Sequence, residues 1–167
     1  TTMLESMLLA AGLRAKACGN IGAPLLEAVL EPGLEVLAIE LSSFQLHWEF
    51  SMSATSAVVL NLAPDHVDWH GSVDAYARDK AKIYEHVRDA CVYNVGDAAT
   101  KTMVENAEVV AGARAIGFTT GIPAPGELGV VDDLLVDRAF IPQRYTAAAE
   151  IASLADVAQA AGTPGQR

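Results

Sequence analysis

Short, uninterrupted apolar runs separated by helical patterns constrain this sequence more than any other feature. Such runs occur at residues 36–39, at 57–60 and, less cleanly, at 91–93. A strand that is buried on both faces reads as a continuous apolar run, and consecutive parallel strands need long, usually helical connections between them. The pattern therefore predicts an α/β fold with a mostly parallel sheet flanked by helices.

Helical periodicity occupies the segments around these runs. One pattern covers residues 4–11 and ends at Gly12, and a second runs from residue 24 to residue 30. Residues 72–87 carry the clearest helix of the chain, with Ser72 as the expected N-cap. A further helix at 98–106 leads to a strand at 114–118.

The sequence changes character after residue 118. Glycine and proline residues alternate with short apolar runs at 130–131, 134–136 and 139–141. This texture predicts a small antiparallel hairpin or meander on the C-terminal side of the parallel sheet. We expect residues 1–150 to form one domain, and residues 151–167 to be a tail or the start of a further segment whose last six residues fray.

Composition excludes several function classes. Eleven Lys and Arg residues against 21 Asp and Glu residues give a net charge of −10, which disfavours general binding to nucleic acid or to an anionic membrane. No apolar run is long enough to span a bilayer, and the first residues lack the basic start of a signal peptide. Cys18 and Cys91 are expected to be reduced core thiols of a cytoplasmic protein.

Polar residues follow each predicted strand, at the edge where open α/β sheets bind ligands. They are Glu40, Ser42, Ser43 and Gln45 after the first strand, Asn61, Asp65, His66, Asp68 and His70 after the second, and Asn94 and Asp97 after the third. Carboxylate, imidazole, hydroxyl and amide groups in this mixture suit a divalent metal ion and phosphate better than an apolar ligand.

Each of these candidates also has a structural interpretation. Glu40 could hold Mg²⁺, or it could cap a helix or form an ion pair. His66 could be a metal ligand or an ordinary histidine in a loop, because Pro64 and Gly71 favour a loop here. Asn20 lies between glycines and could present its amide to a phosphate or occupy a turn.

Lys80 shares one face of the predicted 72–87 helix with Tyr76 and Tyr84, which are four residues away on either side. Between two aromatic rings it could extend its ammonium group to solvent or make a cation–π contact. If desolvated, it could instead present a neutral amine for covalent chemistry. The other charged residues of this segment are expected on the surface: Arg78, Asp79 and Lys82.

Four motifs in this order resemble the central domain of the Mur ligases, the ATP-dependent amino-acid ligases of peptidoglycan precursor synthesis. They are GNIG at 19–22, ELSSFQL at 40–46, NLAPDHVDWHGS at 61–72 and Tyr76-x-x-x-Lys80-x-x-x-Tyr84. The ELSSFQL string is similar to that of the member that joins D-glutamate to UDP-N-acetylmuramoyl-L-alanine through an acyl phosphate. Two alternatives stay open: another Mur ligase or folylpolyglutamate synthetase, and a non-catalytic module that binds a nucleotide sugar.

The resemblance implies roles for six residues. Glu40 and His66 would hold Mg²⁺ ions, and Lys80 would be carbamylated by CO₂ so that its new carboxylate-like group assists the metal at His66. Carbamylation turns a cation into an anion, which accounts for a lysine among metal-binding groups. The implied contacts to the UDP-sugar are Asn20, Ser42 and Gln45.

Two family motifs have no counterpart in this sequence. The Gly-rich phosphate loop and the adenine-contacting segment are missing, so no residue is assigned to ATP, which would be a substrate beside UDP-N-acetylmuramoyl-L-alanine and D-glutamate. We therefore expect a piece of a longer enzyme, without its N-terminal and C-terminal domains and inactive by itself.

Overall fold

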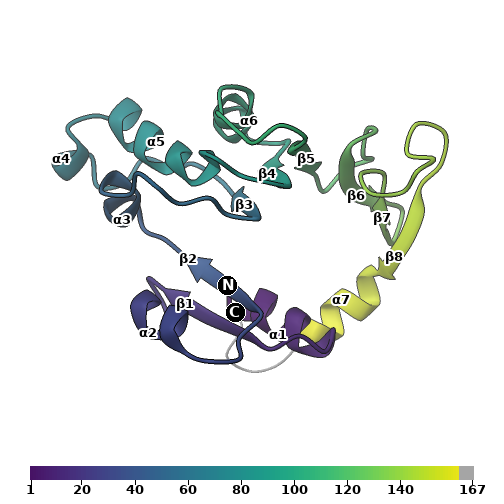
Figure 1. The fold of residues 1–167 in the computed structure, drawn as a ribbon. Coiled ribbons are helices and arrows are strands. Elements are labelled where there is room, and N and C mark those ends of the chain that lie inside the picture. Colours follow the sequence, from purple (N-terminus) through teal and green to yellow (C-terminus); the bar gives the residue numbers. More distant parts are fainter. Residues whose placement is uncertain (162–167) are drawn as a thin grey trace. The chain divides into compact units, whose positions relative to one another are not determined.

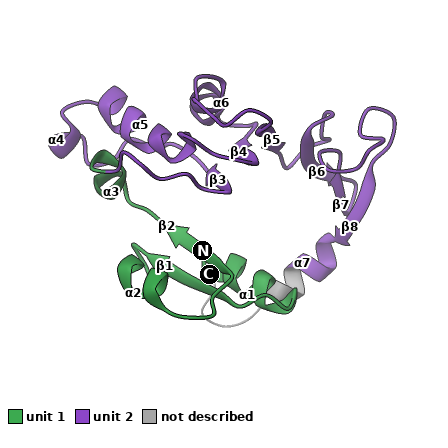
Figure 2. Cartoon of the chain, viewed as in Figure 1, with its two compact units in different colours: residues 1–48 green, residues 49–167 purple. Residues whose placement is uncertain are grey.

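The computed structural model describes residues 1–161, and the chain forms two compact units, Thr1–Trp48 and Glu49–Arg167 (Figures 1 and 2). The fraying expected at residues 162–167 lies outside the described residues. The predicted domain limit at residue 150 stays a prediction.

The first unit is a small parallel sheet with helices. Strand β1 (Ala15–Gly19) pairs in parallel with β2 (Val36–Glu40), and helices α1 (Thr2–Ala10) and α2 (Leu25–Leu30) pack against the pair. Helix α3 (Ser43–His47) follows β2 after a two-residue connection. The two helices predicted from periodicity are confirmed, and so is the strand predicted at 36–39.

The second unit is built on a six-stranded sheet in the order β3-β4-β5-β6-β7-β8. Its strands are β3 (Ser56–Val59), β4 (Ala90–Asn94), β5 (Arg114–Phe118), β6 (Glu127–Val131), β7 (Leu134–Asp137) and β8 (Ala149–Ser153). Pairing is parallel from β3 to β6 and antiparallel from β6 to β8. The predicted α/β fold, mostly parallel with an antiparallel C-terminal part, is confirmed.

The third strand of the antiparallel part lies elsewhere than predicted. It is β8 and not residues 139–141, which lie in a bend. The carboxylate of Asp137 accepts hydrogen bonds from the backbone N–H groups of Ala139 and Phe140, and this turns the chain directly after β7. Ala139 is fully buried, in a cluster with Ala90 and Ile116. The apolar run therefore contributes to the core without continuing the sheet.

Four α-helices accompany this sheet among the described residues of the second unit: α4 (Val67–His70), α5 (Val73–Ala81), α6 (Ala98–Glu105) and α7 (Leu154–Ala161). The hydroxyl of Ser72 accepts a hydrogen bond from the Ala75 N–H, which confirms the predicted N-cap of α5. The predicted helix is too long at its other end. It stops at Ala81 and tightens into a single 3₁₀ turn, η1 (Lys82–Tyr84).

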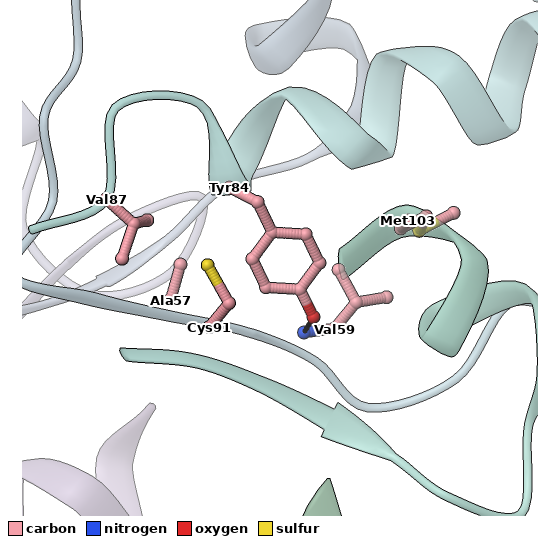
Figure 3. Close-up of a cluster of buried hydrophobic side chains, with 6 residues drawn as sticks. All are labelled: Ala57, Val59, Tyr84, Val87, Cys91 and Met103. Carbon is pink, nitrogen blue, oxygen red and sulfur yellow. Dashed lines mark hydrogen bonds between the residues drawn. The ribbon is translucent and has the colours of Figure 1, made fainter. Parts of the chain in front are cut away.

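The side chain of Tyr84 accounts for this early end. Tyr84 is fully buried, and its hydroxyl accepts from the Val59 N–H at 2.8 Å (Figure 3). The same hydroxyl donates to the Val92 carbonyl oxygen at 2.6 Å. Val59 belongs to β3 and Val92 to β4, so that one phenol joins two neighbouring strands. Because a 3₁₀ turn rotates the chain by more per residue than an α-helix does, it redirects Tyr84 from the face of Tyr76.

The buried cluster around Tyr84 lies on one face of the sheet. It comprises Ala57, Val59, Tyr84, Val87, Cys91 and Met103, and α5 and α6 lie along the same side of β3 and β4 (Figures 1 and 3). Ala57 and Val59 are buried, whereas Val58 between them is 41% exposed. Among the described residues of this unit, α5 and α6 cover the face of β3 that carries Ala57 and Val59, and β3 is an edge strand of its sheet.

Both cysteines are buried free thiols, as predicted. Burial raises the pKa of Cys18 and of Cys91, which keeps both in the neutral thiol form.

None of the helices in the described part of the chain is long and apolar enough to cross a membrane.

Replacing Tyr84 with Phe should lower the free energy of unfolding by about 2 kcal/mol, because a buried N–H and a buried carbonyl each lose a partner. Equilibrium urea unfolding of this chain measures the change. Tyr145→Phe is the matched control, because Tyr145 is 70% exposed and its hydroxyl loss should change stability by less than about 0.5 kcal/mol. Equal effects of the two substitutions would contradict the bridging role of Tyr84.

Candidate functional site

The carboxyl ends of β1 and β2 bring Asn20 and Glu40 together. Gly19, the last residue of β1, is in register with Glu40, the last residue of β2. The Asn20 N–H donates to the Glu40 carbonyl oxygen at 2.7 Å, and the Asn20 side chain is exposed at this edge. Within the first unit, two of the predicted site residues therefore stand side by side where a parallel sheet binds ligands.

Close backbone approach explains the glycines around Asn20. A Cβ on Gly19 would lie 2.2 Å from the Glu40 carbonyl oxygen, and Gly19 has a φ of +106°. A Cβ on Gly22 would lie 2.9 Å from the Ala17 carbonyl oxygen, at a φ of +70°. Only glycine fits both positions without a shift of the backbone. Residues 20–22 form a bend after β1, and a contact of the Asn20 amide with a ligand stays a prediction.

The carboxylate of Glu40 has a partner within its own unit. Its Oε2 atom accepts a hydrogen bond at 2.8 Å from the hydroxyl of Thr1, the residue that precedes α1. A carboxylate next to the first turn of a helix interacts favourably with the helix dipole. This contact is neither an ion pair nor a cap of the following helix, and the binding of Mg²⁺ by the same carboxylate stays a prediction.

Ser42 and Gln45 form a capping box at the start of α3. The Ser42 hydroxyl accepts from the Gln45 N–H at 3.2 Å, and Gln45 Oε1 accepts from the Ser42 N–H at 2.8 Å. The Ser42 hydroxyl also donates to Gln45 Oε1 at 3.0 Å. These contacts give the two residues a structural role that the sequence analysis did not identify, although Ser-x-x-Gln is a recognisable signature of this motif.

His66 lies in the second unit, directly before the single turn of α4. Its backbone is left-handed with a φ of +49°, and its N–H donates to Asp65 Oδ1 at 2.8 Å. Its ring Nε2 lies 3.4 Å from Asp65 Oδ2, and about half of its side chain is exposed. The expected loop is correct for His66, but residues 67–70 form a short helix that ends at Gly71 in a left-handed conformation.

The amine of Lys80 faces one aromatic ring. Lys80 Nζ lies 5.6 Å from the centre of the Tyr76 ring, and the side chain is half-buried. Burial raises the pKa of Tyr76, and the negative charge of Asp65 raises it further. The cation–π interpretation is confirmed for Tyr76. The second expected flank, Tyr84, turns into the core of the sheet instead.

Asp79 corrects the expectation that this helix carries only surface charges around Lys80. It is buried, and its Oδ2 lies 2.8 Å from the Nδ1 of His70, while Oδ1 lies 3.9 Å from Lys82 Nζ. Lys82 also stands over the Phe50 ring at 4.7 Å. Only Arg78 is exposed as predicted. Sequence periodicity does not show that Asp79 is buried, because its partner His70 belongs to a different helix.

The loops after β3 and β4 meet, as the strand-end argument predicts. The Asn94 side-chain amide donates to the Leu60 carbonyl oxygen at 3.0 Å. Asp97 accepts from the Leu62 N–H at 2.7 Å through Oδ2 and caps α6 through Oδ1, which accepts from the Ala99 N–H. These polar residues therefore hold the two loops to each other.

Glu40 belongs to the first unit and His66 and Lys80 to the second, and their meeting at one metal cluster stays a prediction.

A groove of about 720 Å³ runs between α5 and α6. Small and apolar residues line much of it, among them Ala77, Ala81, Ala98 and Met103. Neither Lys80 nor His66 lines this groove, so it is separate from the predicted chemistry.

Comparison with known families identifies the domain. The sequence profile of the Mur ligase middle domain matches residues 1–125, which is three quarters of the chain. The chain belongs to the Mur ligase family. The match contains all four motifs at 19–22, 40–46, 61–72 and 76–84 that resemble this family, so the predicted membership is confirmed.

Curated relatives agree with this membership. The Mur ligase chain is 60% identical to the UDP-N-acetylmuramoylalanine–D-glutamate ligases of Streptomyces avermitilis and Streptomyces coelicolor, in both cases over 93% of its own length. It is 50% identical to the ligase of the same name from Leifsonia xyli, over 95% of its length. The chain spans about a third of the length of these relatives.

Gly19→Ala should destabilise the Mur ligase chain by about 3 kcal/mol or more, because the new Cβ meets the Glu40 carbonyl oxygen at a strained φ. Gly12→Ala is the matched control. Gly12 has a φ of +84° but nothing within 4 Å of its Cβ position, so that only the backbone strain of about 1–2 kcal/mol applies. Urea unfolding of both variants measures the difference. Equal losses would show that close backbone approach is unimportant at Gly19.

Proposed function

We propose that this chain is the middle domain of an ATP-dependent ligase that joins D-glutamate to UDP-N-acetylmuramoyl-L-alanine during peptidoglycan precursor synthesis. The observation that carries the proposal is the 60% identity, over 93% of the chain, to ligases named for this reaction. The ELSSFQL string at 40–46 supports the same choice among the Mur ligases.

The reaction activates a carboxylate. The γ-phosphoryl group of ATP passes to the free carboxylate of UDP-N-acetylmuramoyl-L-alanine, which gives ADP and an acyl phosphate. The amine of D-glutamate attacks the acyl carbon, and inorganic phosphate leaves as the amide bond forms. Phosphoryl transfer of this kind asks a protein mainly for alignment and for compensation of negative charge.

The donor set of the chain fits Mg²⁺. Glu40 offers a carboxylate, and a carbamylated Lys80 would offer a second anionic oxygen group, which are the hard ligands that this ion prefers. The imidazole of His66, directly before α4, would join the modified Lys80 at a second Mg²⁺ ion, separate from the ion at Glu40. Bound Mg²⁺ would offset the charge of the ATP phosphates. The cation–π contact of Lys80 with Tyr76 keeps its amine beside the segment that carries His66.

Substrate contacts would come from the first unit. Asn20 presents an exposed amide at the carboxyl end of β1. Gln45 is also exposed, and because the capping box holds its Oε1 atom, its Nε2 group is the part that can donate to a ligand. We infer a cytoplasmic enzyme, because ATP and a nucleotide-sugar precursor are its substrates.

The full-length protein that contains this chain tests the proposal. Phosphate release should require ATP, UDP-N-acetylmuramoyl-L-alanine and D-glutamate together, and L-lysine or meso-diaminopimelate should not replace D-glutamate. The 167-residue chain by itself should give no turnover. Phosphate release that depends on another amino acid would indicate a different Mur ligase. No phosphate release from the intact protein would contradict the proposal that it is an enzyme.

Lys80→Arg should lower the ligase turnover of the full-length protein by about 100-fold or more, because arginine cannot be carbamylated and its charge opposes metal binding. Lys101→Arg is the control, since Lys101 is exposed on α6 and should keep full activity. NMR of protein in ¹³C-bicarbonate should show a carbamate carbon that Lys80→Arg lacks. An unchanged spectrum in this variant would exclude carbamylation at Lys80.

A further inference from the structure

The pair formed by His70 and Asp79 has no place in the proposed chemistry. Its two side chains are 0% and 12% exposed, and Nδ1 of His70 lies 2.8 Å from Oδ2 of Asp79. His70 is the last residue of α4, and Asp79 lies in the last turns of α5. Because a carboxylate only accepts hydrogen bonds, the imidazole donates through Nδ1, and the bond ties the one-turn helix to the longer one.

The α4 end of this bond is coupled to His66. The N–H groups of Trp69 and His70 both donate to the His66 carbonyl oxygen, at 3.1 and 3.0 Å. His66 itself holds a left-handed conformation that non-glycine residues rarely adopt. A four-residue helix is too short to be stable on its own. The position of His66 therefore depends on whatever holds α4 in place.

The α5 end of the bond is coupled to Lys80. Asp79 precedes Lys80 directly in the helix. The Tyr76 ring lies edge-on to the His70 ring at 5.3 Å, and Lys80 Nζ stands over the same Tyr76 ring at 5.6 Å. A continuous set of contacts thus runs from His66 through His70 and Tyr76 to Lys80.

We propose that His70 and Asp79 are positioning residues that hold His66 in a fixed place relative to Lys80, so that both side chains reach one metal ion. The inference rests on the proposed function for the metal role of His66 and Lys80. The hydrogen bond itself is a feature of the second unit alone. In this role neither residue needs to bind the metal ion itself, and each acts through its neighbour: His70 through α4 and Asp79 through α5.

Four variants of the full-length protein separate the hydrogen bond from side-chain volume. Asp79→Ala removes the acceptor, and His70→Phe removes the donor but keeps a ring against Tyr76. Asp79→Asn and His70→Asn keep an amide oxygen or an amide N–H near the original atoms and should preserve the bond. Asp74→Ala is the control, because Asp74 is an exposed carboxylate on the same helix.

The first readout is amide hydrogen exchange without substrates. Asp79→Ala and His70→Phe should each speed exchange at residues 65–71 by about tenfold or more, while residues 98–105 of α6 keep the wild-type rate. The two amide variants and Asp74→Ala should stay within about twofold of wild type. Unchanged exchange at 65–71 in both disruptive variants would overturn the inference.

The second readout is binding of Mn²⁺ alone, followed by electron paramagnetic resonance in bicarbonate buffer. The disruptive variants should bind Mn²⁺ about tenfold more weakly, the size of effect seen when a group that orients a metal ligand is removed. Faster exchange with unchanged Mn²⁺ affinity would overturn the positioning role, and so would unfolding of both disruptive variants, since either result assigns the pair to stability alone.

Failure of the proposed function has a different signature. If the wild-type protein binds Mn²⁺ but releases no phosphate with the three substrates, the ligase assignment is contradicted. Hydrogen exchange and Mn²⁺ binding then still test the role of His70 and Asp79. If the wild-type enzyme is active but all variants bind Mn²⁺ with the same affinity, the positioning role of His70 and Asp79 is contradicted and the ligase assignment still stands.

Discussion

The hydroxyl of Tyr84 is the interaction on which the second unit depends. It joins β3 and β4 by bonding a backbone group of each strand, inside the buried cluster that packs the helices onto the sheet. Burial raises the pKa of Tyr84 well above its ordinary value, so the phenol stays neutral and keeps its donor. The 3₁₀ turn that contains Tyr84 follows the end of α5, so Tyr84 does not share the face of α5 that carries Tyr76 and Lys80.

Polar residues at the strand ends form hydrogen bonds with backbone groups of neighbouring segments. Asn94 and Asp97 bond the loop after β3, while Ser42 and Gln45 cap the helix after β2. Loops and helix starts leave backbone groups without partners, and short polar side chains supply them. Hydrogen bonds therefore hold the loops at these strand ends, and His66, the proposed metal ligand, lies in the loop that follows β3.

Helix ends, caps and glycine positions could be predicted from the sequence where they depend on residues only a few positions away. The N-cap Ser72, the helix end at Gly12 and the glycines beside Asn20 follow from hydrogen bonding and φ preferences within a few residues. The placement of Asp79 did not follow, because the acceptor role of a helical carboxylate depends on an imidazole from another element. The division of the chain after Trp48 had no local sign either.

The sequence by itself established the α/β class, a mostly parallel sheet with an antiparallel part after residue 118, and membership of the Mur ligase family through its ordered motifs, but not the short helices α3 and α4 or the strand β8. Periodicity and turn chemistry act over a few residues, which is why they can be read from the letters. Only the tertiary structure decided that Tyr84 leaves the helix face of Lys80 and that Asp79 is buried against His70. Both outcomes depend on partners that are close in space but belong to other elements of the fold.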